Sequence, residues 1–308
     1  MKVGVVYGGT AEEREASSKN AADIAAVLKE RGYQVQLIPF EKDFVHTLKS
    51  NGVDLVYVCT QGKGYGDGTI QGILEHEGIP FTGSGMSAAA LINDKILCKL
   101  LFDRYQIPTP HWEILDREQY ESGTFDYEGF GYPFVAKAPT QGGSFGIELI
   151  TCPDDLDRIR NVFHYDDPIL LERFVNGRFY TVGLYESKGH LIVLPVVEGV
   201  DDEKNNHTFG EDGIELISFT GSYSIRQSSL DGELSKKMGE IAQNVFRVTH
   251  AKGVGRVDFM VEENTGHPYV LEINAVPGLK KASLMPQEAK MAGIEYGDMI
   301  EDILLSAQ

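Results

Sequence analysis

Two apolar segments in the last quarter of the chain carry acidic side chains in their interiors. Gly255–Val261 and Tyr269–Ile273 contain the β-branched and aromatic residues typical of strands, and the turn-forming residues Glu263–Gly266 lie between them. Two such runs around a short turn predict an antiparallel hairpin. Both strands have the apolar character of buried elements, so a carboxylate within them requires a cation or a hydrogen-bonding partner.

Side-chain alternation along a strand places Glu272 and Asn274 on one face of this hairpin, and Asp258 can lie across from them. Two carboxylates and one amide oxygen form a hard oxygen ligand set, which suits Mg²⁺ rather than Zn²⁺. We therefore predict a metal site with positions left for water and phosphate oxygens. The alternative is a polar strand face in solvent, which the apolar neighbours of these residues disfavour.

The first part of the chain alternates between strand-like and helix-like segments. Strands are expected at residues 3–7, 34–39 and 54–59, and helices at residues 16–30 and 69–78. This alternation is typical of a parallel α/β sheet. A glycine-rich loop occupies residues 62–68, and the first domain is expected to end near residues 84–86.

The remaining segments predict two further units. A helix at residues 88–105, strands at 134–138, 147–151 and 169–174 and a helix at 153–163 form a small α+β unit. Beyond it we expect a strand at 191–197, an acidic loop at 201–212, a helix at 230–250 and the hairpin. The expected domains are therefore residues 1–86, 87–184 and 185–308.

The acidic composition excludes several classes of partner. The 308 residues include 28 Lys and Arg against 46 Asp and Glu, a formal charge of −18, which argues against nucleic acid and anionic membranes. The three cysteines show neither disulfide nor zinc spacing. No apolar run has the length of a signal-peptide core or a membrane span. These features predict a cytoplasmic protein.

A glycine-rich loop at Gln141–Gly146 joins two predicted strands. It lacks the Gly-Lys-Ser/Thr of a Walker A loop and no helix follows it, so it is either a flap over phosphates or an ordinary hairpin turn. Lys137 lies in the apolar strand before the loop, where a phosphate would explain its charge. Glu172 ends another apolar strand and is either a ligand-binding residue or an exposed carboxylate at a strand end.

Together these segments resemble the D-alanine–D-alanine ligase family of the ATP-grasp superfamily. The resemblance covers nearly the whole chain, in blocks of consistent order and spacing. The matching blocks are Gly8–Glu15, Gly66–Gly72, Pro80–Gly85, Asn93–Lys95, Gly142–Gly146, Arg256–Asp258 and Glu272–Gly278. The fold that this resemblance implies is the ATP-grasp fold, a combination of α/β and α+β units that holds ATP between the central and C-terminal domains behind an N-terminal parallel α/β domain.

The resemblance also implies an activity, in which ATP converts a carboxylate into an acyl phosphate that an amine then attacks. Phosphoryl transfer of this kind depends on positioning and on neutralising charge. The implied ATP-binding residues are Lys95, Lys137 and Glu172, with the flap residues Gly142, Gly143 and Ser144 over the phosphates. The implied ligands of two Mg²⁺ ions, which Mn²⁺ can replace, are Asp258, Glu272 and Asn274.

Four further residues receive roles from the resemblance. Arg256 and the Gly278 backbone N–H are expected to stabilise the acyl phosphate and the tetrahedral intermediate. Glu13 is expected to hold the ammonium group of the first amino acid, and Ser283 the carboxylate of the second. The substrates implied are small amino acids or carboxylates, and the implied assembly is a homodimer.

The sequence departs from the family pattern around the first-substrate pocket. The departures are Gln61-Gly62 for His-Gly, Gly142-Gly143-Ser144 for Gly-Ser-Ser, Phe179 for a ribose-binding glutamate, Leu279-Lys280 for Met/Phe-Thr, and no Lys-Tyr pair in residues 201–226. They favour a specialised ligase that makes another amide or peptide. The alternatives are a genuine D-alanine–D-alanine ligase and a degenerate binding protein. A dinucleotide-dependent oxidoreductase is disfavoured because no fingerprint loop is present.

Two adjacent lysines raise a separate question about the second substrate. Lys280 and Lys281 follow the last family block, at the end of the chain that the resemblance assigns to the second amino acid. One interpretation is that they favour an acidic or larger second substrate. The other is that they are solvated loop residues.

Overall fold

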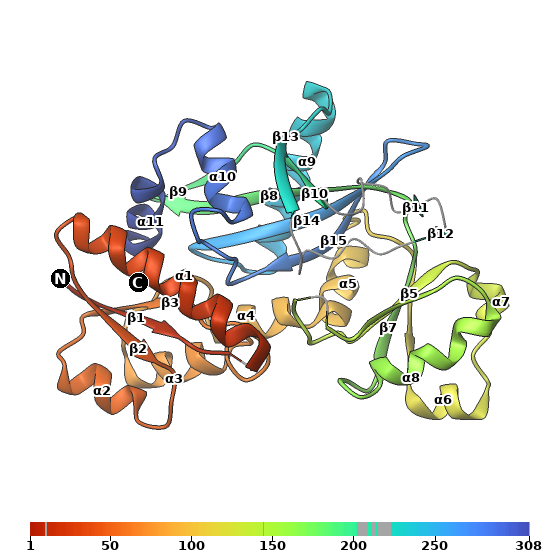
Figure 1. Cartoon of the computed structure of the whole chain (residues 1–308), viewed down its shortest axis with the longest axis horizontal. Coiled ribbons are helices and arrows are strands. Elements are labelled where there is room, and N and C mark those ends of the chain that lie inside the picture. Colours follow the sequence, from red (N-terminus) through yellow and green to blue (C-terminus); the bar gives the residue numbers. More distant parts are fainter. Residues whose placement is uncertain (10, 144, 202–208, 211–212, 215–222, 308) are drawn as a thin grey trace.

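The computed structural model describes residues 1–9, 11–143, 145–201, 209–210, 213–214 and 223–307. Three sheets follow one another along its long axis, with the C-terminal helices returning to the N-terminal sheet (Figure 1). The residues from 202 to 222 that were expected to belong to the acidic loop and to the missing Lys-Tyr pair fall largely outside the described residues.

The N-terminal sheet is parallel, in the order β2-β1-β3, as the alternating sequence predicts. Its strands and helices are β1 (Lys2–Tyr7), α1 (Ala11–Glu30), β2 (Gln34–Pro39), α2 (Phe44–Ser50), β3 (Leu55–Val58) and α3 (Thr69–Glu77). All four residues of β3 are buried, because helices cover both faces of a parallel sheet. Val3 of β1 and Tyr57 of β3 also share an apolar core with Met299 of α11 (Tyr296–Leu305), so one side of the sheet faces the C-terminal part of the chain.

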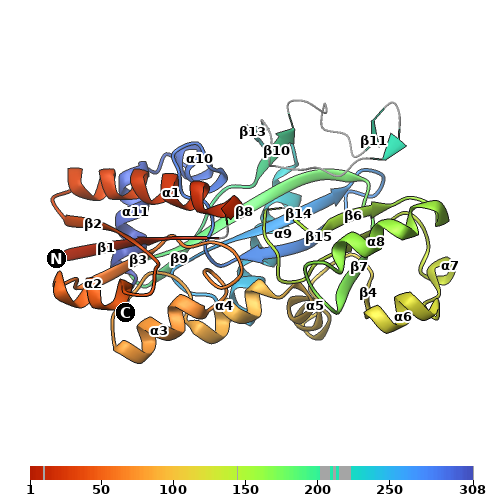
Figure 2. The same cartoon turned by 60° about the horizontal axis from the view of Figure 1, so that its bottom comes forward.

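Two helices connect this sheet to the small domain (Figure 2). They are α4 (Met86–Asn93) and α5 (Lys95–Arg104), where the sequence predicted one helix over 88–105. That prediction is wrong because Asp94 has an extended backbone, and its carboxylate accepts hydrogen bonds from the N–H groups of Ile96 and Leu97. Asp94 thus ends one helix and caps the next, which places Lys95 at the first position of α5.

The small sheet is antiparallel, in the order β4-β7-β5-β6. Its elements are β4 (Trp112–Leu115), α6 (Arg117–Ser122), α7 (Tyr127–Phe130), β5 (Phe134–Lys137), β6 (Ile147–Ile150), the 3₁₀ helix Pro153–Arg158, α8 (Ile159–Val162) and β7 (Ile169–Arg173). The single helix predicted at 153–163 is wrong, since its first part is 3₁₀ and only one turn of α-helix follows. The expected strands of this unit are confirmed.

The largest sheet runs β13-β10-β8-β14-β15, and β9 pairs with β8. Its elements are β8 (Gly177–Ser187), β9 (His190–Val193), β10 (Val197–Asp201), β13 (Tyr223–Gln227), α9 (Gly232–Val248), β14 (Val254–Glu262), β15 (Pro268–Asn274), α10 (Leu284–Met291) and α11 (Tyr296–Leu305), with a two-stranded ribbon of β11 (Phe209–Gly210) and β12 (Gly213–Ile214) beside it. The single strand predicted at 191–197 is wrong, because β9 and β10 are separate strands.

Strand β8 was not predicted, although it is the longest strand and occupies the centre of this sheet. Residues 177–184 therefore pair with β14 and β10, while the expected division assigns them to the central domain. The three-part division itself stays a prediction.

The C-terminal helices pack against the N-terminal domain. Apolar residues of α11, including Ile300, Ile303 and Leu304, share one core with Ile24 and Leu28 of α1. Arg31 forms ion pairs with Asp298 and Glu301 at the edge of this contact. In Figure 1 the two chain ends accordingly lie in the same region. This contact brings α1 and the loop after β15 together.

Candidate active site

The hairpin of β14 and β15 pairs the predicted metal ligands directly. Asp258 lies opposite Glu272, and Arg256 lies opposite Asn274, with an irregularity in register just after Asp258. The predicted hairpin and the facing carboxylates are therefore confirmed. The four polar side chains occupy alternate positions, so they share one face of two otherwise apolar strands.

Arg256 and Asp258 form a bidentate ion pair. Nε and a terminal nitrogen of Arg256 each lie 2.7 Å from an oxygen of Asp258, and the Thr181 hydroxyl donates to the same carboxylate at 3.0 Å. Burial opposes the charge of Arg256, but the adjacent Asp258 outweighs it and raises the pKa of the guanidinium. Arg256 therefore remains cationic at any physiological pH, as a residue that neutralises phosphate must.

Lys95 connects α5 to the hairpin. Its Nζ lies 3.2 Å from the Glu272 carboxylate and donates to the Gln141 carbonyl at 2.8 Å. Burial tends to raise the pKa of Glu272, but Lys95 and Arg256 together hold it below its usual range. Glu272 is consequently an ionised carboxylate between two cations.

A second cluster of charges lies between α5 and the small sheet. Glu172 contacts both Lys99 and Lys137, and Lys99 also contacts the hydroxyl of Thr109. Burial would raise the pKa of Glu172, but the two lysines outweigh it and lower that pKa. Neither Lys137 nor Glu172 is among the residues that line the cavity described below, so their contacts with ATP stay predictions.

The glycine-rich loop joins β5 to β6 as predicted. The Ala138 N–H donates to the Gly146 carbonyl at 2.7 Å, and the Phe145 N–H to the Gly142 carbonyl at 3.1 Å. Gly143 has a φ of +60°, which a residue without Cβ adopts readily. Ser144, the third predicted flap residue, lies outside the described residues.

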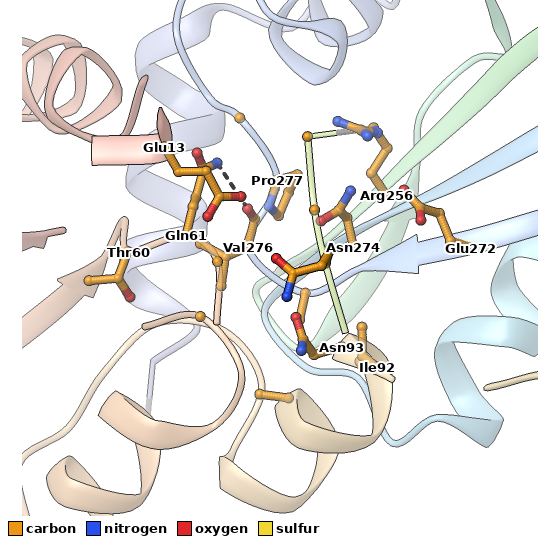
Figure 3. A pocket seen from close by; sticks show the side chains of 18 of the residues that line it. Glu13, Thr60, Gln61, Ile92, Asn93, Arg256, Glu272, Asn274, Val276 and Pro277 are labelled. Atoms are coloured by element: carbon orange, nitrogen blue, oxygen red, sulfur yellow. Dashed lines mark hydrogen bonds between the residues drawn. The ribbon is translucent and has the colours of Figure 1, made fainter. Parts of the chain in front are cut away.

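Many of these groups line a cavity of about 620 Å³ (Figure 3). Among the residues with roles that the resemblance implies, its lining includes Glu13, Lys95, Arg256, Glu272, Asn274 and Gly278. Gly142 and Gly143 line it as well, whereas Asp258 lies behind Arg256. In Figure 3 Glu13 and Gln61 approach from the N-terminal domain, opposite Arg256 and Glu272.

Glu13 fits closely against two glycines. A Cβ at Gly62 would lie 1.6 Å from one Glu13 carboxylate oxygen, and a Cβ at Gly142 would lie 3.0 Å from the other. Gln61, which stands where the family has histidine, donates to the Val276 carbonyl at 3.4 Å. The glycine-rich turn after β3 therefore leaves space for the Glu13 carboxylate.

Ser283, which is expected to hold the carboxylate of the second amino acid, lies close to Gly278 of the cavity lining. It is the N-cap residue of α10, is 7% exposed and is not among the lining residues. Its Oγ lies 3.2 Å from the point where a Gly278 Cβ would be. Contact between Ser283 and a substrate carboxylate stays a prediction.

Three features of the site have weak sequence signals. Lys99 is one helical turn from Lys95, and this i, i+4 spacing was the only indication of its role. Thr181 belongs to the strand that was missed. Glu288 is fully buried in α10, and its Oε2 accepts the Gly183 N–H at 2.6 Å. No sequence pattern indicated that Glu288 is buried.

Phe179, the residue at the expected ribose-binding position, lies in an apolar cluster with Val175, Met260 and Leu284.

Among the described residues, no group of three or more His, Cys, Asp or Glu side chains forms a metal site. The predicted ligands Asp258, Glu272 and Asn274 include only two carboxylates, so this absence does not test them. The metal site stays a prediction. Within the described part of the chain, no helix is both long enough and apolar enough to cross a membrane.

Comparisons with known proteins agree with this geometry. A family model described as D-ala D-ala ligase C-terminus matches residues 101–305. The chain is 34% identical over 313 residues to the D-alanine–D-alanine ligase of Geobacter sulfurreducens, covering 100% of this chain and 94% of the relative. It is 33% identical over 317 residues to that of Carboxydothermus hydrogenoformans, covering 99% and 97%.

Solved structures show the same fold. The D-alanine–D-alanine ligase from Bacillus anthracis complexed with ATP superposes with a TM-score of 0.82 at 26% identity, covering 99% of this chain and 97% of that one. The predicted combination of an ATP-grasp fold with a parallel N-terminal sheet is thereby confirmed. The matches in sequence extend over the whole chain and include every block on which the resemblance rested, and the chain belongs to the D-alanine–D-alanine ligase family.

Proposed function

We propose that this protein is a D-alanine–D-alanine ligase that uses ATP to join two D-alanine molecules in the cytoplasm. The support is the similarity to relatives named D-alanine–D-alanine ligase, at 33–34% identity over nearly the whole length of both chains. The observation that carries the proposal is the convergence on one cavity of Glu13, Lys95, Arg256, Glu272 and Gly278, which come from α1, α5, the β14–β15 hairpin and the loop after it.

The groups around the cavity fit ATP and Mg²⁺ by their chemistry. Lys95 and the backbone of Gly142 and Gly143 offer a cation and N–H groups of the kind that hold phosphates. Glu272 and Asn274, with Asp258 behind them, offer the oxygen atoms that Mg²⁺ prefers. A bound Mg²⁺ would supply positive charge that neutralises the phosphates.

The protein residues have complementary tasks. Glu13 provides a carboxylate for the ammonium group of the first amino acid, and Arg256 provides a permanent positive charge for the phosphate that its carboxylate receives. The backbone N–H of Gly278 is an oxyanion donor for the addition of the second amine. Proximity of these groups accounts for catalysis, because phosphoryl and acyl transfer need no protein nucleophile here.

A specialised substrate is the second candidate. Gln61 lines the cavity in place of the family's histidine, and this departure favours an altered first-substrate pocket. The names of the relatives favour D-alanine over this alternative. The two candidates predict the same reaction and differ only in the amino acids accepted.

The test is release of ADP and phosphate from Mg²⁺-ATP across a panel of D- and L-amino acids. Glu272→Ala should abolish turnover, while Glu262→Ala, at the far end of the same hairpin and paired with Arg173, should retain it. D-alanine as the best substrate supports the proposal. Another preferred pair supports the specialised ligase, and ATP binding without turnover on any pair rejects both.

A further inference from the structure

Lys280 lines the cavity, and the neighbouring residue Lys281 is exposed. The Lys281 ammonium lies over the ring of Tyr296, 5.7 Å from its centroid. The two consecutive lysines therefore differ: the side chain of Lys280 faces the cavity, and that of Lys281 faces the surface beside Tyr296. The solvated-loop interpretation fits Lys281 alone.

The charges of the cavity differ in how they are paired. Lys95 is paired with Glu272, and Arg256 is paired with Asp258. Within the described part of the chain, Lys280 forms neither an ion pair nor a side-chain hydrogen bond. An ammonium group at a cavity wall that no protein anion occupies can form a charge-assisted hydrogen bond to a bound carboxylate.

Hydrogen bonds fix the backbone on both sides of Lys280. Asn20 accepts the Leu279 N–H at 2.8 Å, and the Tyr296 hydroxyl donates to the Leu279 carbonyl at 2.8 Å. The Lys280 carbonyl accepts the Ser283 N–H at 2.7 Å. Asp23 accepts the Lys281 N–H at 3.2 Å. The loop therefore presents the Lys280 side chain from a fixed backbone, which lowers the entropic cost of binding an anion.

The position of this loop indicates which substrate is held. Its contacts with Asn20 and Asp23 place it along α1, the helix that also supplies Glu13 and Ala16 to the cavity. The phosphate-binding groups, Lys95 and the glycine-rich loop, come instead from α5 and the small sheet. In the proposed reaction the carboxylate of the first amino acid accepts the phosphate and its ammonium group pairs with Glu13, so a carboxylate held by Lys280 belongs to the second amino acid.

We propose that Lys280 binds a carboxylate of the second amino acid and is a specificity-determining residue for it. This inference rests on the proposed ligase function. Ser283 is buried outside the lining, so Lys280 is better placed for this contact. The carboxylate is either the α-carboxylate that every acceptor carries or the side-chain carboxylate of an acidic acceptor.

The test compares Lys280→Gln with Lys281→Gln in the full-length protein, using ¹³C-labelled acceptors and unlabelled D-alanine as donor. Product formation is measured by mass spectrometry for D-alanine against D-alaninamide and for D-aspartate against D-asparagine. Lys280→Gln should reduce the preference for the charged member of one pair by about tenfold to a hundredfold, through KM more than kcat. If the preference for D-alanine over D-alaninamide is lost, Lys280 binds the α-carboxylate. If the preference for D-aspartate over D-asparagine is lost, Lys280 binds the side-chain carboxylate.

Calorimetric binding of the same four compounds in the presence of ADP gives a readout that does not depend on turnover. If Lys280→Gln keeps both preferences, or if Lys281→Gln loses them equally, the assignment of Lys280 is wrong. A wild-type protein that makes no peptide from any acceptor rejects the ligase function. In that case the calorimetric preference still decides whether Lys280 binds a carboxylate.

Discussion

The ammonium group of Lys99 contacts the carboxylate of Glu172, and the two side chains are 1% and 2% exposed. Lys99 comes from α5 and Glu172 from β7, so the pair joins the connecting helix to the small sheet. Lys137 contacts the other oxygen of the same carboxylate. One carboxylate thus compensates two cations inside the protein, and the three charges depend on one another.

Glu172→Gln is expected to destabilise the protein by about 3–5 kcal/mol, because it leaves Lys99 as a buried cation without a counter-charge. Lys137→Met should cost less, about 1–2 kcal/mol, since Glu172 retains Lys99 and Lys137 is partly exposed. Urea denaturation of both variants measures the difference. Equal losses in the two variants would contradict a central role for Glu172.

Gly62→Ala is expected to displace the Glu13 carboxylate. The added Cβ would lie 1.6 Å from a carboxylate oxygen, at a φ of +86°. Gly64→Ala is the matched control, because its φ is +79° and no atom lies within 4 Å of the new Cβ. Both should lose about 1–2 kcal/mol of stability from the left-handed backbone. Only Gly62→Ala should raise KM for the first amino acid, by about tenfold or more.

The measurement is amino-acid-dependent phosphate release, with thermal unfolding run in parallel. A similar KM in both alanine variants would show that Glu13 does not hold the substrate amine.

Glu288→Gln is expected to change how stability depends on pH. Burial raises the pKa of Glu288 to about 8, although the Gly183 N–H opposes this shift. A carboxyl with a raised folded pKa stabilises the fold below its unfolded value of about 4.5, and that contribution is lost as pH rises to about 8. As the pH rises through this range, the free energy of unfolding of the variant should therefore increase relative to that of the wild type by up to about 5 kcal/mol.

Denaturant midpoints of the two proteins between pH 5 and 9 measure this gain, with Glu121→Gln as a control for an exposed carboxylate. A difference between Glu288→Gln and wild type that stays constant with pH would mean that Glu288 is ionised in the folded protein.

Local patterns in the sequence predicted the hairpin and its facing carboxylates. Apolar runs around a turn determine the pairing of β14 and β15, and alternation then places Asp258 opposite Glu272. The parallel N-terminal sheet followed for the same reason, from regular strand and helix periods. Elements whose register depends on such short-range features were the most predictable.

Features that depend on contacts between distant segments were harder to predict from the sequence. The residues of β8, with aromatic and β-branched types from Phe179 to Tyr185, favour a strand that was missed, and its pairing with β14 and β10 joins segments that are separated in the sequence. The division between α4 and α5 depends on one backbone conformation at Asp94, which the helical period of its neighbours obscures. The burial of Glu288 depends on Gly183, more than 100 residues earlier.

Asp94→Ala is expected to weaken ATP binding through Lys95. The Asp94 carboxylate accepts the Ile96 N–H at 2.9 Å and the Leu97 N–H at 3.2 Å, which holds the first turn of α5 in place. Loss of this cap should cost about 1 kcal/mol and let the turn that carries Lys95 fray. KM for ATP should therefore rise several-fold, and Asp94→Asn, which retains a capping oxygen, should restore both values.

Asp231→Ala is the matched control for this prediction. Asp231 caps α9 in the same way, accepting the Leu234 N–H at 2.7 Å, and α9 contributes no residue to the cavity lining. It should lose the same stability while KM for ATP stays at the wild-type value. If both alanine variants raise KM equally, the effect arises from general destabilisation. If only Asp94→Ala raises KM for ATP, the Asp94 cap positions Lys95 for the nucleotide.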